Sequence, residues 1–299
     1  LYRRELNKSL KKFELSGSQL VSSRPVSQVA ISSDDSMVAT CSWGGDLKIL
    51  STETLEIIKA FDTAHDSKIG GVDWNPDRTA LVTGAANGEI RIWNLNNDSE
   101  SPAGTLTGHE NRVARVRFHP SGKYVASASF DMTWRLWDVE KQIELQLQEG
   151  HAKEVYCVAF QKDGSLLCST GLDSVGLVWD LRSGKSIMAL EGHTKPIYGL
   201  DWSPNGYEIA TGSADGTIRL WDVRKVGILG ALPAHSSIVS EVKFDKANGH
   251  YLVSSSYDKT LNIYSGDNWT KLSVIQGHTD KILSVDISTD GSHLFSSGW

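Results

Sequence analysis

The chain has 299 residues, a formal net charge of −6, 39% hydrophobic residues and three cysteines. This acidic balance argues against a protein that coats a nucleic-acid backbone, because phosphate binding needs a concentrated positive surface. The cysteines Cys41, Cys157 and Cys168 lie in apolar runs without the paired spacing of metal ligands, which indicates buried, reduced thiols. No run reaches the roughly 18 apolar residues of a membrane span, and no signal peptide is visible.

Residues 1–12 form a basic lead-in with five Lys or Arg residues against one Glu. Leu6, Leu10 and Phe13 recur at helical spacing, so the segment predicts a short helix. That helix either packs on the rest of the chain or contacts RNA or an acidic partner, and both alternatives stay open. Residues 13–20 then predict an outer strand that closes a ring, because they precede the first repeat as residues 272–276 precede the last.

One sequence unit recurs every 42 to 44 residues from residue 21 to residue 299 and predicts a repeat fold. The typical unit has a Gly-His or Ala-His dipeptide, a short strand, a turn with Asp, a second strand and a closing residue that is aromatic in all cases but the first. The closing residues are Leu50, Trp93, Trp137, Trp179, Trp221 and Tyr264. Alternating apolar and polar residues, as in 197–202 and 218–221, predict half-buried antiparallel strands.

This unit resembles the repeat of the WD-repeat family of β-propellers, over nearly the whole chain. The count of units and the resemblance predict an all-β, seven-bladed WD-repeat β-propeller at residues 13–299, with a short N-terminal helical lead-in at 1–12. The His-to-Asp spacing of 22 residues, applied to His278, puts the last Asp near position 300. We therefore expect an incomplete seventh blade and a natural chain that continues past Trp299.

The resemblance also implies a structural tetrad in each blade. In the family, Asp accepts hydrogen bonds from a turn and from His, His reaches a strand hydroxyl, and that hydroxyl reaches Trp. The positions that match are His109, Asp131, Trp137, His151, Asp173, Trp179, His193, Asp215, Trp221, His235 and Asp258. Asn87, Tyr264, and the pair Gly44 and Leu50 replace tetrad members in blades two, six and one, which predicts weaker blades there.

The histidines and aspartates are therefore assigned to structure rather than to catalysis. Six of the nine histidines occupy the repeat position, whereas catalysis needs one asymmetric site. No Gly-rich phosphate loop, Cys/His metal cluster or nucleophile context is visible. We expect no enzyme activity, no cofactor, no metal and no small-molecule substrate.

Partner binding is expected where the repeats differ, on the face that carries the turn before each Asp and the loop after each His. The family's contact positions, carried over to this chain, are Trp43, Lys68, Arg112, Phe130, Leu172, Tyr257, Lys281 and Trp299. Aromatic residues there either pack among neighbouring loops or form a partner-binding hot spot. The mixture of basic and aromatic residues favours an acidic peptide or helix over an RNA backbone.

Stretches beyond the generic repeat resemble the WD-repeat proteins of the U4/U6 small nuclear ribonucleoprotein; they are residues 108–122, 130–138, 187–193, 197–206 and 286–291. The resemblance implies a noncatalytic scaffold in pre-mRNA splicing, in the nucleus, that supports U4/U6.U5 tri-snRNP assembly through protein–protein contacts. The implied partners are other U4/U6 splicing proteins, pre-mRNA-processing factor three first among them. Contact with U4/U6 RNA is expected to be mainly indirect, and no membrane contact is expected.

Two alternatives remain. The runs Trp179-Asp180-Leu181-Arg182 and Trp221-Asp222-Val223-Arg224 fit the Trp-Asp-x-Arg box of substrate receptors of cullin-type ubiquitin ligases. A generic chromatin or signalling WD-repeat scaffold is the other.

Overall fold

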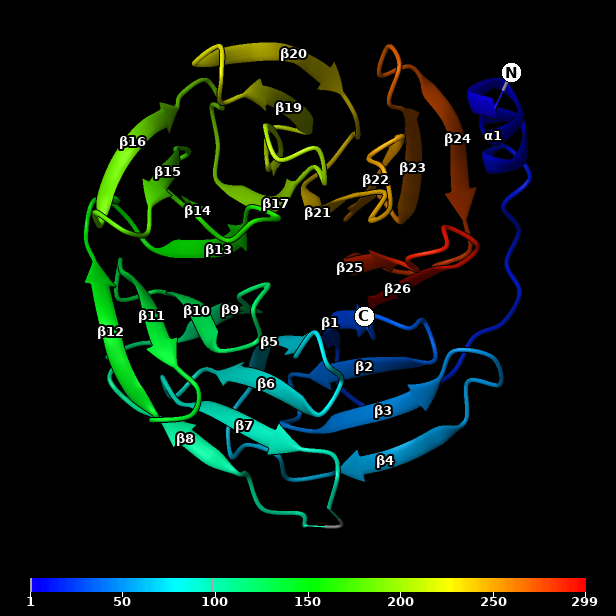
Figure 1. Ribbon diagram of the computed structural model, residues 1–299. Coiled ribbons are helices and arrows are strands. Elements are labelled where there is room, and N and C mark those ends of the chain that lie inside the picture. The colour runs from blue at the N-terminus through cyan, green and yellow to red at the C-terminus, as the bar shows by residue number, and fades with distance from the viewer. Residues whose placement is uncertain (1, 98) are drawn as a thin grey trace.

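The structure is a computed structural model that describes residues 2–97 and 99–299; Leu1, which belongs to the predicted lead-in, lies outside the described residues, as does Asp98. Figure 1 shows the sheets as sectors around a central axis, visited in chain order from blue to red. A single blade cannot bury the faces of its own sheet, so each sheet covers its neighbours and the ring as a whole forms the core.

Six sheets have four antiparallel strands each, and we number them as blades one to six. Blade one contains β1 (Val26–Ile31), β2 (Met37–Ser42), β3 (Leu47–Ser51) and β4 (Ile57–Phe61). Blade two contains β5 (Ile69–Trp74), β6 (Ala80–Ala85), β7 (Ile90–Asn94) and β8 (Gly104–Leu106). Blade three contains β9 (Val113–Phe118), β10 (Tyr124–Ser129), β11 (Trp134–Asp138) and β12 (Ile143–Gln148).

Blade four contains β13 (Val155–Phe160), β14 (Leu166–Gly171), β15 (Gly176–Asp180) and β16 (Lys185–Leu190). Blade five contains β17 (Ile197–Trp202), β18 (Glu208–Ser213), β19 (Thr217–Asp222) and β20 (Gly227–Pro233). Blade six contains β21 (Val239–Phe244), β22 (Tyr251–Ser256), β23 (Thr260–Ser265) and β24 (Lys271–Gln276). The remaining sheet, which we call the seventh sector, has only β25 (Ile282–Ile287) and β26 (Leu294–Gly298).

The prediction of seven blades is wrong: the structure has six four-stranded blades, and a two-stranded hairpin occupies the seventh sector. Residues 277–299 supply an inner and a second strand and no more. The outer strand predicted at residues 13–20 does not form either, and these residues have no regular structure. An outer strand must pair with a third strand, and the seventh sector has none to offer.

The lead-in contains the helix α1 (Tyr2–Leu10), which lies beside β24 on the outside of the ring (Figure 1). Leu10 is 1% exposed and belongs to the core cluster of blade six and the seventh sector, together with Tyr251 and Ile263. Leu6 and Phe13 pack against the same cluster. The apolar stripe of the helix therefore faces the propeller. Among residues 2–97 and 99–299, no helix is long and apolar enough to cross a membrane.

Inner-strand carboxylates join neighbouring blades. The backbone N–H of Phe118 donates to Asp73 Oδ2 at 2.8 Å, and that of Phe244 donates to Asp201 Oδ2 at 2.8 Å. Each of these bonds runs from one blade to the carboxylate of the preceding blade. They satisfy backbone groups that would otherwise be buried without a partner.

The same bond closes the ring between the seventh sector and blade one. Asp286 Oδ2 accepts the N–H of Ile31 at 2.8 Å and also lies 2.9 Å from Lys246 Nζ. Ser284 Oγ accepts the N–H of Val29 at 3.2 Å, and Ser297 donates to the carbonyl of Val26 at 3.1 Å. The ring therefore closes through hydrogen bonds between residues that are 255 or more positions apart in the chain.

Glycine in the turn between the second and third strands lets blades approach closely. Gly88 and Gly216 have φ angles of 86° and 80°. A Cβ at Gly88 would lie 2.5 Å from the carbonyl oxygen of His109, and one at Gly216 would lie 2.6 Å from that of His235. Since both oxygens belong to the next blade, these turns set the distance between neighbouring blades.

We predict that Asp286→Ala lowers the free energy of unfolding by about 3 kcal/mol, because it leaves the Lys246 ammonium and the N–H of Ile31 without their buried acceptor. Urea unfolding followed by circular dichroism measures the change. Asp62→Ala is the control, because the Asp62 side chain is 81% exposed and lies 4.0 Å from Lys48. Equal losses in the two variants would contradict the role of Asp286 in closing the ring.

Candidate partner-binding face and the hydrogen-bond network beneath it

Three blades contain an unbroken chain of hydrogen bonds from a turn carboxylate to a buried indole. In blade three, His109 Nδ1 lies 2.7 Å from Asp131 Oδ2, and His109 Nε2 lies 2.7 Å from Ser127 Oγ. Trp137 Nε1 donates to the same hydroxyl at 2.8 Å. The corresponding residues are His151, Asp173, Ser169 and Trp179 in blade four, and His193, Asp215, Thr211 and Trp221 in blade five.

Blade six keeps the histidine end of this chain and changes the other end. His235 lies 2.9 Å from Asp258 and 2.7 Å from Ser254. Tyr264 occupies the place of the tryptophan, and its hydroxyl donates to the carbonyl of Ala234 at 3.4 Å. Asn262 donates to that carbonyl at 2.8 Å. These two donors thus reach a backbone carbonyl, whereas the indole N–H of blades three to five donates to the strand hydroxyl.

In blade two the chain of hydrogen bonds is incomplete. His65 Nε2 lies 2.8 Å from Thr83 Oγ1, which also accepts the indole N–H of Trp93 at 2.9 Å. His65 Nδ1 is buried without a hydrogen-bond partner, because Asn87 stands where blades three to six have Asp. Burial and the nearby charge of Arg91 lower the pKa of His65 to about 3. The imidazole is therefore neutral at physiological pH.

The turn carboxylates are held in their ionised form. Burial acts to raise the pKa of Asp215, but hydrogen bonds from Thr217 and His193 outweigh it and lower the pKa to about 2. Burial lowers the pKa of His193 and of His235, despite their aspartate partners. These groups are thus fixed as neutral imidazole and carboxylate. Among the described residues, no group of three or more His, Cys, Asp or Glu side chains could hold a metal ion.

The predicted partner-binding positions lie next to each other in the backbone of each repeat. The N–H of the residue before the Asp position donates to the carbonyl of the residue three after the His. This bond joins Phe130 to Arg112 at 2.9 Å and Trp299 to Lys281 at 3.1 Å. The same bond joins Leu172 to Glu154, so blade four has an acidic neighbour where blade three has a basic one.

Basic side chains lie over aromatic rings on this face, which we call the cation–aromatic face. Lys68 Nζ lies 5.2 Å from the ring centre of Trp43, and the Arg112 guanidinium lies 5.1 Å from that of Phe130. Lys281 Nζ lies 5.6 Å from the ring of Tyr257 and 5.2 Å from that of Trp299. Seven of the eight predicted positions therefore form cation–π contacts; Leu172 has none.

The aromatic residues of this face also connect blade one with the seventh sector. The rings of Trp43 and Trp299 meet edge to face at 5.4 Å between centres. Trp299 is 57% exposed, and Lys68 and Lys281 are exposed. Packing among loops therefore covers part of each ring and leaves the rest open to a partner.

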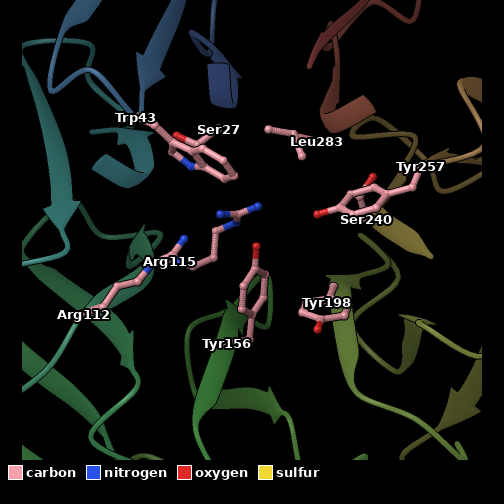
Figure 2. Close-up of a pocket in the computed structure, with 9 residues that line it drawn as sticks. All are labelled: Ser27, Trp43, Arg112, Arg115, Tyr156, Tyr198, Ser240, Tyr257 and Leu283. Carbon is pink, nitrogen blue, oxygen red and sulfur yellow. The ribbon is translucent and has the colours of Figure 1, made fainter. Parts of the chain in front are cut away.

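Sequence reasoning missed three residues of a pocket at the centre of this face. Arg115, Tyr156 and Tyr198 line it with Trp43 and Tyr257, and Figure 2 shows Arg115 and the hydroxyl of Tyr156 reaching into the same space. The sequence contained a signal for the two tyrosines, because Tyr156 and Tyr198 are both the second residues of their inner strands. The same place in other blades is Ser27, Gly70, Ala114, Ser240 and Leu283, so bulk at this position varies from blade to blade.

The two Trp-Asp-x-Arg runs differ in the structure. The Arg224 guanidinium forms two bonds to Asp222, at 3.0 Å and 2.8 Å, and lies 3.4 Å from the ring centre of Tyr207. Arg182 is exposed, and its backbone N–H donates to Asp180. The arginine of the second run is thus engaged within its own blade.

Comparison with known proteins identifies a matching family and several relatives. The WD40 family, described as "WD domain, G-beta repeat", matches residues 10–51, 56–94, 100–138, 143–180, 184–222, 227–265 and 269–299. The chain is 57% identical over 305 aligned positions to the U4/U6 small nuclear ribonucleoprotein PRP4 of Saccharomyces cerevisiae, which covers 100% of this chain and 66% of that protein. The chain thus spans slightly less than two thirds of the length of that relative. The resemblance to the U4/U6 WD-repeat proteins is confirmed.

Other relatives share shorter segments. An uncharacterized WD repeat-containing protein of Schizosaccharomyces pombe is 41% identical over 130 residues, 40% of this chain and 28% of its own length. The target of rapamycin complex subunit wat1 of the same organism is 34% identical over 103 residues, 34% of this chain and 32% of its own length. These matches reflect the repeat itself.

We predict that Asn87→Asp raises the free energy of unfolding by about 1 kcal/mol, because the new carboxylate accepts the proton of the unpartnered His65 Nδ1. Thermal and urea unfolding at pH 7.5 measure the gain. Asn96→Asp makes the same charge change at an exposed position, away from a buried imidazole, and serves as the control. An equal effect of both substitutions would show that charge alone is responsible.

Stability should also fall on mild acidification. The pKa of His65 is about 3 in the folded state, against about 6.5 in an unfolded chain. Between these values the unfolded chain binds more protons, so the free energy of unfolding decreases as the pH falls from about 6.5 toward 3. The lowered pKa values of His193 and His235 act in the same direction. We expect a lower urea midpoint at pH 5 than at pH 7.5; equal midpoints would contradict this.

Proposed function

Because the chain belongs to the WD40-repeat family, we propose that it is a noncatalytic scaffold of the U4/U6 small nuclear ribonucleoprotein, acting in pre-mRNA splicing in the nucleus. In this role it supports U4/U6.U5 tri-snRNP assembly through protein–protein contacts. The observation that carries the proposal is the 57% identity to PRP4 over the full length of this chain, since a shared repeat alone gives far shorter matches. Its partners are other U4/U6 splicing proteins, with pre-mRNA-processing factor three first, and its contact with U4/U6 RNA is mainly indirect.

The mechanism is rigid presentation of several loops at once. The face is built on turns whose carboxylates and histidines are hydrogen-bonded, so little conformational freedom is lost when a partner binds. Lys68, Arg112 and Lys281 give this face a positive strip on a chain of net charge −6. An acidic, extended segment or helix of a partner protein is the complement of that strip.

Purification of the tagged full-length protein from nuclear extract at moderate salt tests the assembly. We expect stoichiometric U4 and U6 RNAs together with splicing proteins. Recovery of a cullin adaptor without these RNAs would overturn the scaffold proposal and favour the ligase receptor.

A second test addresses the face itself. We predict that Trp43→Ala combined with Phe130→Ala reduces capture of the protein partner by at least about tenfold, since aromatic residues dominate binding energy at interfaces. The control is Leu145→Ala combined with Ile187→Ala, two exposed apolar residues on the outer strands β12 and β16. Circular dichroism and the melting temperature establish that the ring stays folded. Undiminished capture by a folded Trp43/Phe130 variant would contradict this assignment of the site.

A further inference from the structure

A small pocket at the centre of the cation–aromatic face has hydrogen-bond donors without acceptors. Its volume is about 20 Å³, room for one small polar group, and no acidic side chain lines it. Trp43 Nε1 and Arg112 Nε are both buried without a hydrogen-bond partner, and both residues line this pocket. A buried donor without an acceptor costs roughly 1–3 kcal/mol. Two such donors belong to residues that line one pocket, and a small side-chain shift would bring them to an acceptor that enters it.

A second guanidinium adds positive charge at the same place. Arg115 Nη1 donates to the carbonyls of Gly70 at 2.6 Å and Ala114 at 3.1 Å, which fixes the side chain. Its guanidinium lies 5.1 Å from the ring centre of Tyr156 and reaches the space between Trp43, Tyr156 and Tyr257 (Figure 2). Arg115 is therefore held in place within the pocket, next to Trp43.

The deeper carboxylate Glu241 favours the charged form of Arg115, but it does not line the pocket and has several other partners. Glu241 accepts bonds from the N–H of Val285 at 3.2 Å and from Arg117 at 3.3 Å, and lies 3.8 Å from Lys243. It also binds the hydroxyl of Ser284. No acidic side chain lines the pocket itself, so the pocket side of Arg112 and Arg115 is open to an anionic group that enters from the face.

The tyrosine hydroxyls of this pocket act as donors as well. Burial, with Tyr156 and Tyr198 nearby, raises the pKa of Tyr257 to about 12, against the opposing effect of Arg115 and Arg112. Burial also raises the pKa of Tyr198. Both phenols therefore keep their protons at neutral pH and can donate to an anion.

We propose that this pocket binds the carboxylate of a single Asp or Glu side chain from an extended segment of a partner protein, with Trp43, Arg112 and Arg115 as its donors. The inference rests on the proposed scaffold function and names the partner group that enters the centre of the face. The planar carboxylate matches the fork of N–H donors that a guanidinium presents. The flanking Lys68 and Lys281 then contact further acidic residues of the same segment.

The test is a titration of the full chain with a capped tripeptide that has a central glutamate. The readout is the NMR signal of the Trp43 indole N–H, assigned with Trp43→Phe, because that proton gains an acceptor on binding. We expect a saturable downfield shift at millimolar peptide. The matched glutamine tripeptide should bind at least about tenfold more weakly, a difference of about 1.4 kcal/mol.

Variants separate the pocket from general surface charge. Arg112→Gln should abolish the shift, and Arg112→Lys should weaken it, because Lys keeps the charge and loses the Nε–H donor. Arg182→Gln removes an exposed arginine elsewhere and should leave the shift unchanged. Melting curves of each variant confirm folding. Equal binding of the glutamine tripeptide, or full binding by a folded Arg112→Gln variant, would overturn the proposal.

Two further probes distinguish other sources of negative charge. Inorganic phosphate or uridine monophosphate binding more tightly than the glutamate tripeptide would overturn the carboxylate assignment and point to a phosphoryl group or RNA. The titration needs no splicing component, so its outcome is independent of the nuclear purification. If the protein fails to bind the glutamate tripeptide but still recovers U4 and U6 RNAs, the pocket proposal alone is contradicted. If it binds the tripeptide but recovers no U4 or U6 RNA, the scaffold proposal alone is contradicted.

Discussion

Ring closure is the constraint on which the rest of this structure depends. No single blade can bury both faces of its sheet, so each one is stable only between two neighbours. The carboxylates of Asp73, Asp201 and Asp286 repeat one solution, accepting a backbone N–H from the next blade. At Asp286 this bond joins strands from opposite ends of the chain. The closed ring therefore fixes the position of every loop on the cation–aromatic face.

The hydrogen-bond network beneath the face holds the turns in fixed positions on the closed ring. A carboxylate such as Asp131 holds both its own turn and a histidine of the same blade, and that histidine reaches the hydroxyl that binds a buried indole. Buried networks of this kind stabilise only when every member has a partner. Their repetition in successive blades explains why a chain with many His, Asp and Ser residues needs no catalytic interpretation for them.

Variation between blades is concentrated where the network ends. Arg112 and Phe130 in blade three, and Lys281 and Trp299 in the seventh sector, are paired by one backbone bond that also exists in blade four, where the pair is Glu154 and Leu172. The fold therefore holds the positions constant and leaves their chemistry free. An acidic chain can in this way present a compact positive and aromatic surface without changing its blades.

The sequence by itself determined the repeat, the antiparallel strands and the pairs His109–Asp131 or His193–Asp215, because these depend on spacing within one unit. It overcounted the blades, since a repeat signal marks where a unit begins but not how many strands it completes. Only the tertiary structure decided the pocket at the centre of the face, because Trp43, Arg115, Tyr156 and Tyr257 come from four different blades. Their convergence depends on the curvature of the closed ring, which no local pattern encodes.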